Sequence, residues 1–194
     1  QDKYGFLWIG TEEGLNRYDG IMIKSYSICP QAAGKYISSL YGTKKNIWIG
    51  TDEGIYIYAY ATETFTYFDL TTPNNVRITS IVNHILQDKD GNLWFSTNGQ
   101  GLFRYNLSKN YLEQYEFTSA FGIVASTMAD SDNQIWALTN QGESGVYKLN
   151  KAENKFEPFG LLYNAGNHHS QALAMLEDSE QTLWLGTWEC GCKK

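Results

Sequence analysis

The sequence predicts an all-β protein assembled from four-stranded antiparallel sheets, and three observations lead to this prediction. One short segment, with a tryptophan followed three residues later by a threonine, recurs five times. The tryptophans are separated by 40, 46, 42 and 48 residues, a regular spacing typical of repeat architectures. Aromatic residues make up 15% of the chain and 18 residues are glycine, which favours strands and tight turns over helices. The five copies are Leu7–Thr11, Ile47–Thr51, Leu93–Thr97, Ile135–Thr139 and Leu183–Thr187.

Each copy is embedded in the same order of turns and strands. A polar turn such as Asp88–Asn92 precedes the tryptophan strand, and a turn ending in glycine such as Glu12–Gly14 follows it. Aspartate, asparagine and glycine are the residues that hairpin turns favour. One strand is expected before each polar turn: Ile37–Tyr41, Ile81–Leu86, Ile123–Met128 and Ala172–Leu176. A third strand is expected after the glycine turn, at Leu15–Tyr18, Ile55–Tyr58, Leu102–Tyr105 and Val146–Leu149, and a fourth at Phe65–Phe68 and Tyr111–Phe117.

The tryptophan strand has large apolar residues on both faces, as in Leu93, Trp94 and Phe95. Such a strand must be buried on both sides. The blades of a β-propeller meet this condition because each blade lies between two others, and a period of 40 to 48 residues is that of one blade. A two-sheet sandwich is the alternative, but it does not predict this long repeat. We therefore expect the five repeat tryptophans to be buried anchors of the blades: Trp8, Trp48, Trp94, Trp136 and Trp184.

The repeats predict a propeller fragment with three complete blades and two partial ones. The complete blades are expected at about 36–69, 79–117 and 122–159, and the partial repeats at about 1–28 and 172–194. The first repeat lacks the strand before its tryptophan, and the last stops inside its third strand. The glycine in the Trp-x-Gly-Thr segments is expected to let the next sheet approach closely. This organisation indicates an excerpt of a longer protein.

Composition argues against several classes of function. The net charge is −6 and the basic residues are scattered, so this segment is not expected to bind nucleic acid. No apolar run approaches the length of a membrane span, and no targeting peptide is visible at residues 1–8, so no membrane contact is expected. Cys29, Cys190 and Cys192 contain no CxxC pair, so we expect no metal site, no cofactor and no disulfide between Cys29 and the other two.

A candidate contact surface lies in the last two repeats. In a propeller the loops between blades and the turns after the tryptophan strands share one face, and binding residues concentrate in such loops. Sugar recognition requires an aromatic platform beside amide and charged groups. The candidate residues are Tyr163, Asn164, His168, His169 and Trp188, with Arg77 as an outlier on the same face. The alternatives are that Trp188 covers a loop or a blade edge, and that the two histidines occupy an ordinary exposed loop.

The repeat resembles the two-component regulator propeller repeat. Leu7–Asp19 (LWIGTEEGLNRYD) fits that pattern almost completely, Leu93–Asn106 fits with one inserted residue, and Ile135–Asn150 is the most divergent copy. The resemblance implies a periplasmic, ligand-sensing domain of a hybrid two-component sensor kinase that responds to carbohydrate and regulates polysaccharide utilisation. It also implies an oligosaccharide ligand, contacts with further blades and sensor domains of the parent protein, and leaves a homodimer open. Since the sequence shows no kinase motif, this segment is expected not to be an enzyme.

Two other functions remain as alternatives. One is a non-catalytic scaffold that binds protein partners, and the other is a propeller lyase or hydrolase. Catalysis would require converging acid and base groups, whereas His84 alternates with apolar residues in an expected strand and is interpreted as structural. Sialidase-type propellers place an aspartate five residues before the tryptophan, where this chain has Lys89 flanked by Asp88 and Asp90.

Overall fold

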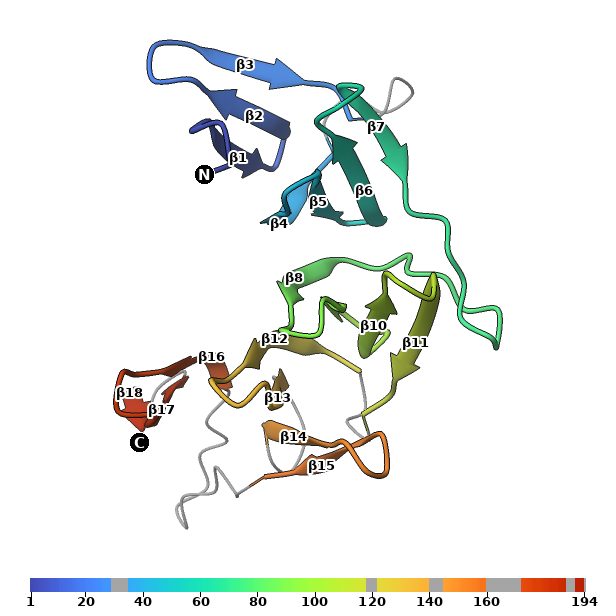
Figure 1. The fold of residues 1–194 in the computed structure, drawn as a ribbon, viewed down its shortest axis with the longest axis vertical. Helices are drawn as coiled ribbons and strands as arrows, with labels where there is room; N and C mark the ends of the chain where they lie inside the picture. The colour runs from blue at the N-terminus through green and yellow to red at the C-terminus, as the bar shows by residue number, and fades with distance from the viewer. Residues whose placement is uncertain (29–34, 118–121, 140–144, 160–171, 188–190, 194) are drawn as a thin grey trace. The chain divides into compact units, whose positions relative to one another are not determined.

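The computed structural model describes residues 1–28, 35–117, 122–139, 145–159, 172–187 and 191–193. These residues form antiparallel sheets and, within the described ranges, no helix. Correspondingly, the described part of the chain contains no helix that could cross a bilayer. The chain divides into two compact units, residues 1–85 and 86–194, with the boundary inside strand β8 (Val82–Gln87) (Figure 1).

The first unit contains a three-stranded sheet and a complete four-stranded one. The sheet order β1-β2-β3 and the order β4-β5-β6-β7 both follow the sequence, so each sheet is a simple meander. The strands of the first sheet are β1 (Leu7–Thr11), β2 (Gly14–Tyr18) and β3 (Ile23–Tyr26). Those of the second are β4 (Ile37–Gly42), β5 (Asn46–Thr51), β6 (Gly54–Ala59) and β7 (Thr64–Tyr67).

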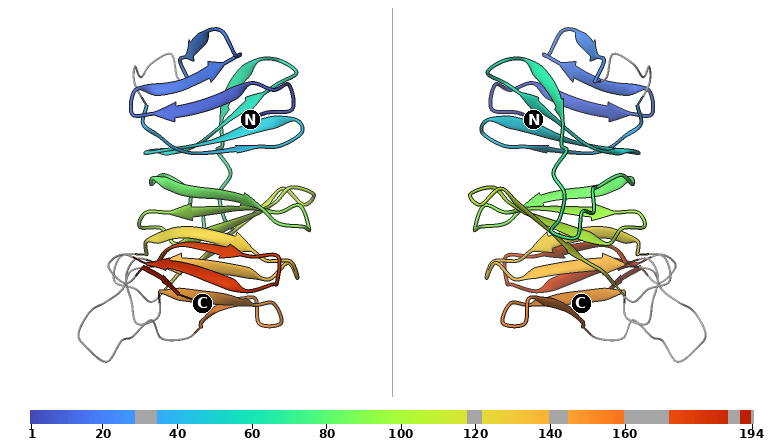
Figure 2. Two further views of the ribbon diagram at one scale, coloured as in Figure 1. Left: turned by 90° about the vertical axis from the view of Figure 1, so that its left-hand side faces the viewer. Right: turned by 90° about the vertical axis from the view of Figure 1, so that its right-hand side faces the viewer.

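The remaining three sheets repeat this meander (Figure 2). The sheet that begins with β8 continues with β9 (Leu93–Thr97), β10 (Leu102–Asn106) and β11 (Tyr111–Tyr115). The next sheet contains β12 (Val124–Ala129), β13 (Ile135–Thr139), β14 (Val146–Asn150) and β15 (Lys155–Pro158). The last contains β16 (Ala172–Glu177), β17 (Leu183–Thr187) and β18 (Gly191–Lys193). Three complete blades and two partial ones are therefore confirmed; we number the blades one to five in chain order.

The inner strands of consecutive blades lie against one another, which is the arrangement of a propeller. Within the first unit β1 lies against β4, and within the second unit β12 lies against both β9 and β16. Glycine permits one of these approaches at Gly10, where an added Cβ would come within 2.5 Å of the Ile37 side chain. At Gly50 a Cβ would lie 2.9 Å from the Val82 Cβ and would also strike the Ser39 hydroxyl. The expected role of glycine in the Trp-x-Gly-Thr segments is confirmed at these two positions.

The repeat tryptophans differ in how much of their surface is exposed. Trp48, Trp94 and Trp136 are buried, with 3%, 1% and 4% of their surfaces exposed, and Trp8 is partly buried. The prediction of burial is wrong for Trp184, whose exposed fraction is 36%. Two of the buried tryptophans pack against the blade that follows them: Trp94 contacts Phe156 of blade four, with ring centroids 6.1 Å apart, and Trp136 shares an apolar cluster with Leu185 of blade five. For Trp184 no following sheet is present among the described residues, so its ring remains in contact with solvent.

Candidate functional site

The aspartates of the polar turns are structural. The Asp88 carboxylate accepts a hydrogen bond from the Trp94 indole Nε1 at 2.8 Å and another from the backbone N–H of Asn92, also at 2.8 Å. One side chain therefore closes the β8–β9 turn and fixes the rotamer of the blade anchor. The same indole-to-carboxylate bond joins Trp8 to Asp2, Trp136 to Asp130 and Trp184 to Asp178, in each case across six residues. In blade two Gly42 stands at the aspartate position.

In the first three repeats the threonine organises the turn that follows the tryptophan strand. Thr51 Oγ1 donates to the Gly54 carbonyl at 3.0 Å, and Thr97 Oγ1 donates to the Gly101 carbonyl at 2.6 Å. Both threonines are fully buried. The hydroxyl holds the backbone of this turn without help from the side chains at its tip, although in blade two one of these, Glu53, forms an ion pair with Lys35.

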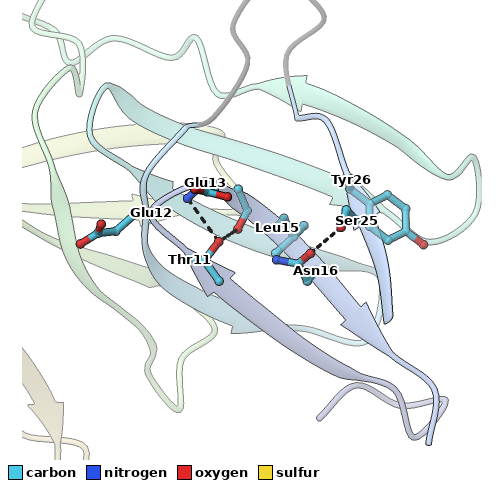
Figure 3. A pocket seen from close by; sticks show the side chains of 8 residues that line it. Thr11, Glu12, Glu13, Leu15, Asn16, Ser25 and Tyr26 are labelled. Atoms are coloured by element: carbon cyan, nitrogen blue, oxygen red, sulfur yellow. Dashed lines mark hydrogen bonds between the residues drawn. The ribbon is translucent and has the colours of Figure 1, made fainter. Parts of the chain in front are cut away.

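In blade one this turn borders an open groove of about 700 Å³ (Figure 3). The groove is lined by Thr11, Glu12, Glu13, Gly14, Leu15, Asn16, Ser25 and Tyr26. Thr11 Oγ1 donates to the Gly14 carbonyl at 2.9 Å and accepts from the Glu13 backbone N–H at 3.3 Å. Farther along the groove, Ser25 Oγ donates to Asn16 Oδ1 at 2.7 Å. Buried Leu15 supplies the apolar part of the lining.

The polar groups of the groove are suited to binding hydroxyl groups. Within the described residues the carboxylates of Glu12 and Glu13 form no hydrogen bond or ion pair, so their oxygens are available as acceptors. The Asn16 amide nitrogen adds a donor. Tyr26 does not present its ring as a platform, because that ring packs 5.2 Å from the Trp8 ring and 5.9 Å from the Phe65 ring. Figure 3 accordingly shows the Tyr26 ring directed away from Glu12 and Glu13.

Of the six predicted contact residues, only Arg77 lies within the described part of the chain. Its Nε donates to Asp69 Oδ1 at 2.8 Å in an exposed ion pair, and its backbone bridges to Thr71 across the β7–β8 connection. Tyr163, Asn164, His168, His169 and Trp188 lie outside the described residues, so the predicted cluster remains a prediction. Cys29 and Cys190 also lie outside them. Cys192 is part of strand β18.

Sequence reasoning overlooked two features. The aspartate six residues before the tryptophan could have been found, because it recurs in four of the five repeats. The groove of blade one could not have been found in this way, since Glu12 and Glu13 match the ordinary repeat pattern. Its openness depends on which surfaces of the blade are covered, and the sequence of a repeat does not specify this.

Comparison with known proteins supports the repeat assignment. Residues 75–99 match the model of the family described as two component regulator propeller. A curated relative, "Histidine kinase P4" of Formosa agariphila, is 28% identical over 135 residues, which represent 66% of this chain and 10% of the relative. The chain therefore spans a small part of that relative.

Solved structures show the same fold. The extracellular domains of BT4673 and BT3049 of B. thetaiotaomicron, which are described as hybrid two component systems, are each 24% identical to this chain. Their TM-scores are 0.78 and 0.77, and the match covers 96% of this chain and 24% and 26% of theirs. Virginiamycin B lyase of Staphylococcus aureus is 17% identical with a TM-score of 0.72, and the match covers 94% of this chain and 60% of the lyase. These likenesses establish the propeller fold.

Proposed function

We propose that this chain, which carries two-component regulator propeller repeats, is a non-catalytic, extracytoplasmic sensor domain of a hybrid two-component histidine kinase. We further propose that its ligand is a carbohydrate and that its location is periplasmic. The observation that carries the proposal is a difference between the turn before the tryptophan strand and the turn after it. Aspartates in the turns before the tryptophan are consumed by indole and backbone hydrogen bonds, whereas Glu12 and Glu13 remain available beside a groove. Similarity to a histidine kinase and to extracellular domains of two-component systems supports the sensor role.

Carbohydrate is proposed because the groove presents several hydrogen-bonding groups around a small apolar surface. Carboxylate and amide side chains bond vicinal hydroxyls, and sites of this type bind through a few placed polar groups. The sequence-predicted cluster around Tyr163 and Trp188 would supply aromatic surfaces to the same ligand class.

Titration of oligosaccharides into the full-length protein, followed by calorimetry, tests this proposal. Glu12→Gln and Glu13→Gln are expected to weaken binding about tenfold each, because charge-assisted hydrogen bonds are the stronger ones. Glu153→Gln, in an exposed turn of blade four, is the matched control and should leave affinity unchanged. Trp188→Ala and Tyr163→Ala test the predicted cluster in the same assay. Failure of every oligosaccharide to bind would reject a carbohydrate ligand.

A protein-binding scaffold is the second candidate, and one surface feature favours it. Ile21, Met22 and Ile23, at the β2–β3 hairpin, have 89%, 68% and 64% of their surfaces exposed. Substituting all three with serine should abolish capture of a protein partner while leaving oligosaccharide affinity intact.

The absence of catalysis is tested by a screen against glycans and esters, in view of the structural similarity to a lyase. We expect no turnover. Turnover that disappears in His168→Ala or His169→Ala would show that the segment is an enzyme.

A further inference from the structure

Blade three contains an internal carboxylate site. Arg104 lies opposite Trp94 on one side and opposite Glu113 on the other. Its Nη2 donates to Glu113 Oε2 at 2.5 Å, and the Tyr115 hydroxyl donates to the same oxygen at 2.9 Å. The Asn154 amide donates to Glu113 Oε1 at 2.6 Å. The guanidinium carbon lies 5.6 Å from the ring centroids of both Trp94 and Tyr115. Three donors thus converge on one carboxylate beside two aromatic rings.

Blade one repeats this arrangement without the carboxylate. Arg17 lies opposite Trp8, and its guanidinium carbon is 5.9 Å from the Trp8 ring and 5.7 Å from the Tyr26 ring. On the third strand, however, Lys24 lies opposite Arg17, at the position that Glu113 occupies in blade three. The arginine, the tryptophan and the tyrosine are retained, while the acid is replaced by a second cation.

In blade one a buried donor of Arg17 is unsatisfied. Like charges directly opposite one another on neighbouring strands are destabilising. The Arg17 Nε is buried and has no hydrogen-bond partner among the described residues. The guanidinium instead lies 4.2 Å from the Phe6 ring, and Lys24 Nζ lies 4.9 Å from the Tyr26 ring. A buried donor without an acceptor is unfavourable, so the site is stabilised by any acceptor that reaches it.

The other two complete blades do not share this feature. In blade two the residue opposite the tryptophan is Ile57, and Ile57 in turn lies opposite Thr66. In blade four the corresponding residues are Lys148 and Glu157. The structure describes this register position in blades one to four. Among these four blades, two cations face one another only in blade one.

No neighbouring acid forms an ion pair with either cation among the described residues. The Asp19 carboxylate accepts hydrogen bonds from the Met22 and Ile21 N–H groups, which lower its pKa, and the charge of Arg17 lowers that pKa to a smaller extent. The Asp2 carboxylate is occupied by the Trp8 indole and by the backbone N–H groups of Tyr4 and Phe6. Glu63 ends the β6–β7 turn with a φ of 53°, as Asn154 ends the β14–β15 turn with a φ of 51°. Within the described residues the Glu63 carboxylate is exposed and forms no ion pair with either cation.

We propose that Arg17 and Lys24 bind a carboxylate of the ligand in the place that Glu113 fills in blade three. The ligand class rests on the proposed function, which makes the carboxylate that of a uronate in an acidic oligosaccharide. A guanidinium donates to both oxygens of a carboxylate, and the exposed ammonium of Lys24 adds a second charge-assisted bond. Tyr26 occupies the register position of Tyr115, whose hydroxyl donates to Glu113 in blade three.

The test uses trigalacturonate and triglucuronate, each compared with its methyl ester, titrated into the full-length protein. The free acids are expected to bind at least about tenfold more tightly than the esters, which cannot accept charge-assisted bonds. Arg17→Gln and Lys24→Glu should remove this preference. Lys155→Glu, an equal change of charge on an exposed strand residue of blade four, should retain it.

Lys24→Glu also provides a readout that does not depend on ligand. It restores the Arg–Glu pair of blade three, so we expect a higher Tm than that of the natural chain. An unchanged or lower Tm, equal affinity for acids and esters, or a preference that survives Lys24→Glu would overturn the proposal. If neutral oligosaccharides bind while the acids gain nothing, the carboxylate site alone is wrong. If no saccharide binds, the proposed carbohydrate ligand fails together with it.

Discussion

At the scale of single residues, the buried tryptophans are the strongest determinants of the fold. Trp94 packs within 5.7 Å of the Tyr115 ring in its own blade and within 6.1 Å of the Phe156 ring in the next. Its indole N–H is satisfied by Asp88, so burial leaves no polar group without a partner. A tryptophan at this position therefore contributes both packing and orientation.

Truncating a buried anchor should be far more harmful than truncating the exposed one. We expect Trp48→Ala and Trp94→Ala each to lower the free energy of unfolding by about 3–5 kcal/mol, because a large cavity replaces the ring. Trp184→Ala, at 36% exposure, should have a distinctly smaller effect. Urea denaturation followed by circular dichroism measures both. Equal losses at Trp94 and Trp184 would contradict the burial argument.

The Asp–Trp bond predicts the effect of a single carboxylate. Asp88→Ala should lower the free energy of unfolding by about 2–3 kcal/mol, since it removes charge-assisted bonds to a buried indole and to a backbone N–H. Asp132→Ala, at an exposed turn residue whose carboxylate has no such role, serves as the control. A loss at Asp132 as large as that at Asp88 would show that general charge effects dominate.

Tyr60 predicts a loss of stability at alkaline pH. Burial raises the pKa of its hydroxyl from 10.0 to about 12, and the hydroxyl has no hydrogen-bond partner among the described residues. The folded state keeps this proton where the unfolded chain has lost it, so stability is complete below pH 10 and falls as pH rises from 10 towards 12. Tyr60→Phe should flatten this decline without loss at pH 7. Denaturation midpoints measured from pH 8 to 11.5 would reveal the difference, and parallel curves for both proteins would contradict it.

At the scale of elements, the packing of a blade depends on how closely its strands approach the inner strand of the next blade. Gly50 faces Val82 so closely that a methyl group would have to displace the backbone carbonyl, 2.9 Å away. In blade three the equivalent residue is Ser96, whose hydroxyl bonds the Thr127 hydroxyl of blade four at 2.5 Å. Glycine and serine are thus two solutions to the same narrow spacing.

A methyl group added at Gly50 should destabilise the first unit. Gly50→Ala is expected to lower the free energy of unfolding by about 1–3 kcal/mol through overpacking. Gly42→Ala, in the same blade but with its nearest neighbouring atom 4.0 Å from the added Cβ, should be nearly neutral. Thermal unfolding of both variants tests this, and an equal decrease in Tm would rule out the steric explanation.

At the scale of the whole molecule, Cys29 lies several repeats away from Cys190 and Cys192. Cys29 follows the first sheet, whereas Cys192 lies in strand β18 of the last. Because a disulfide requires Cα atoms within about 7 Å, we expect none between Cys29 and either of the other two cysteines. Mass spectrometry after alkylation under denaturing, non-reducing conditions should show a modified Cys29. An unmodified Cys29 would reveal a bridge, and Cys29→Ser should then leave its former partner open to alkylation.

The sequence alone determined the blade. Strand positions, the meander and the count of three complete blades follow from hydrophobic alternation and turn residues, which act over a few neighbouring positions. The resemblance to two-component regulator propellers follows from the same local pattern, because the repeat signature is carried by contiguous residues such as Leu7–Asp19.

Only the tertiary structure decided which equivalent residues behave alike. Trp94 and Trp184 occupy the same repeat position, yet burial separates them because packing depends on the sheet that lies opposite. Likewise Arg17 and Arg104 match in sequence, but their cross-strand partners, Lys24 and Glu113, give one an unsatisfied donor and the other an ion pair. A repeat sequence encodes its own strands, whereas the energy of a side chain is set by residues that the chain brings to it from elsewhere.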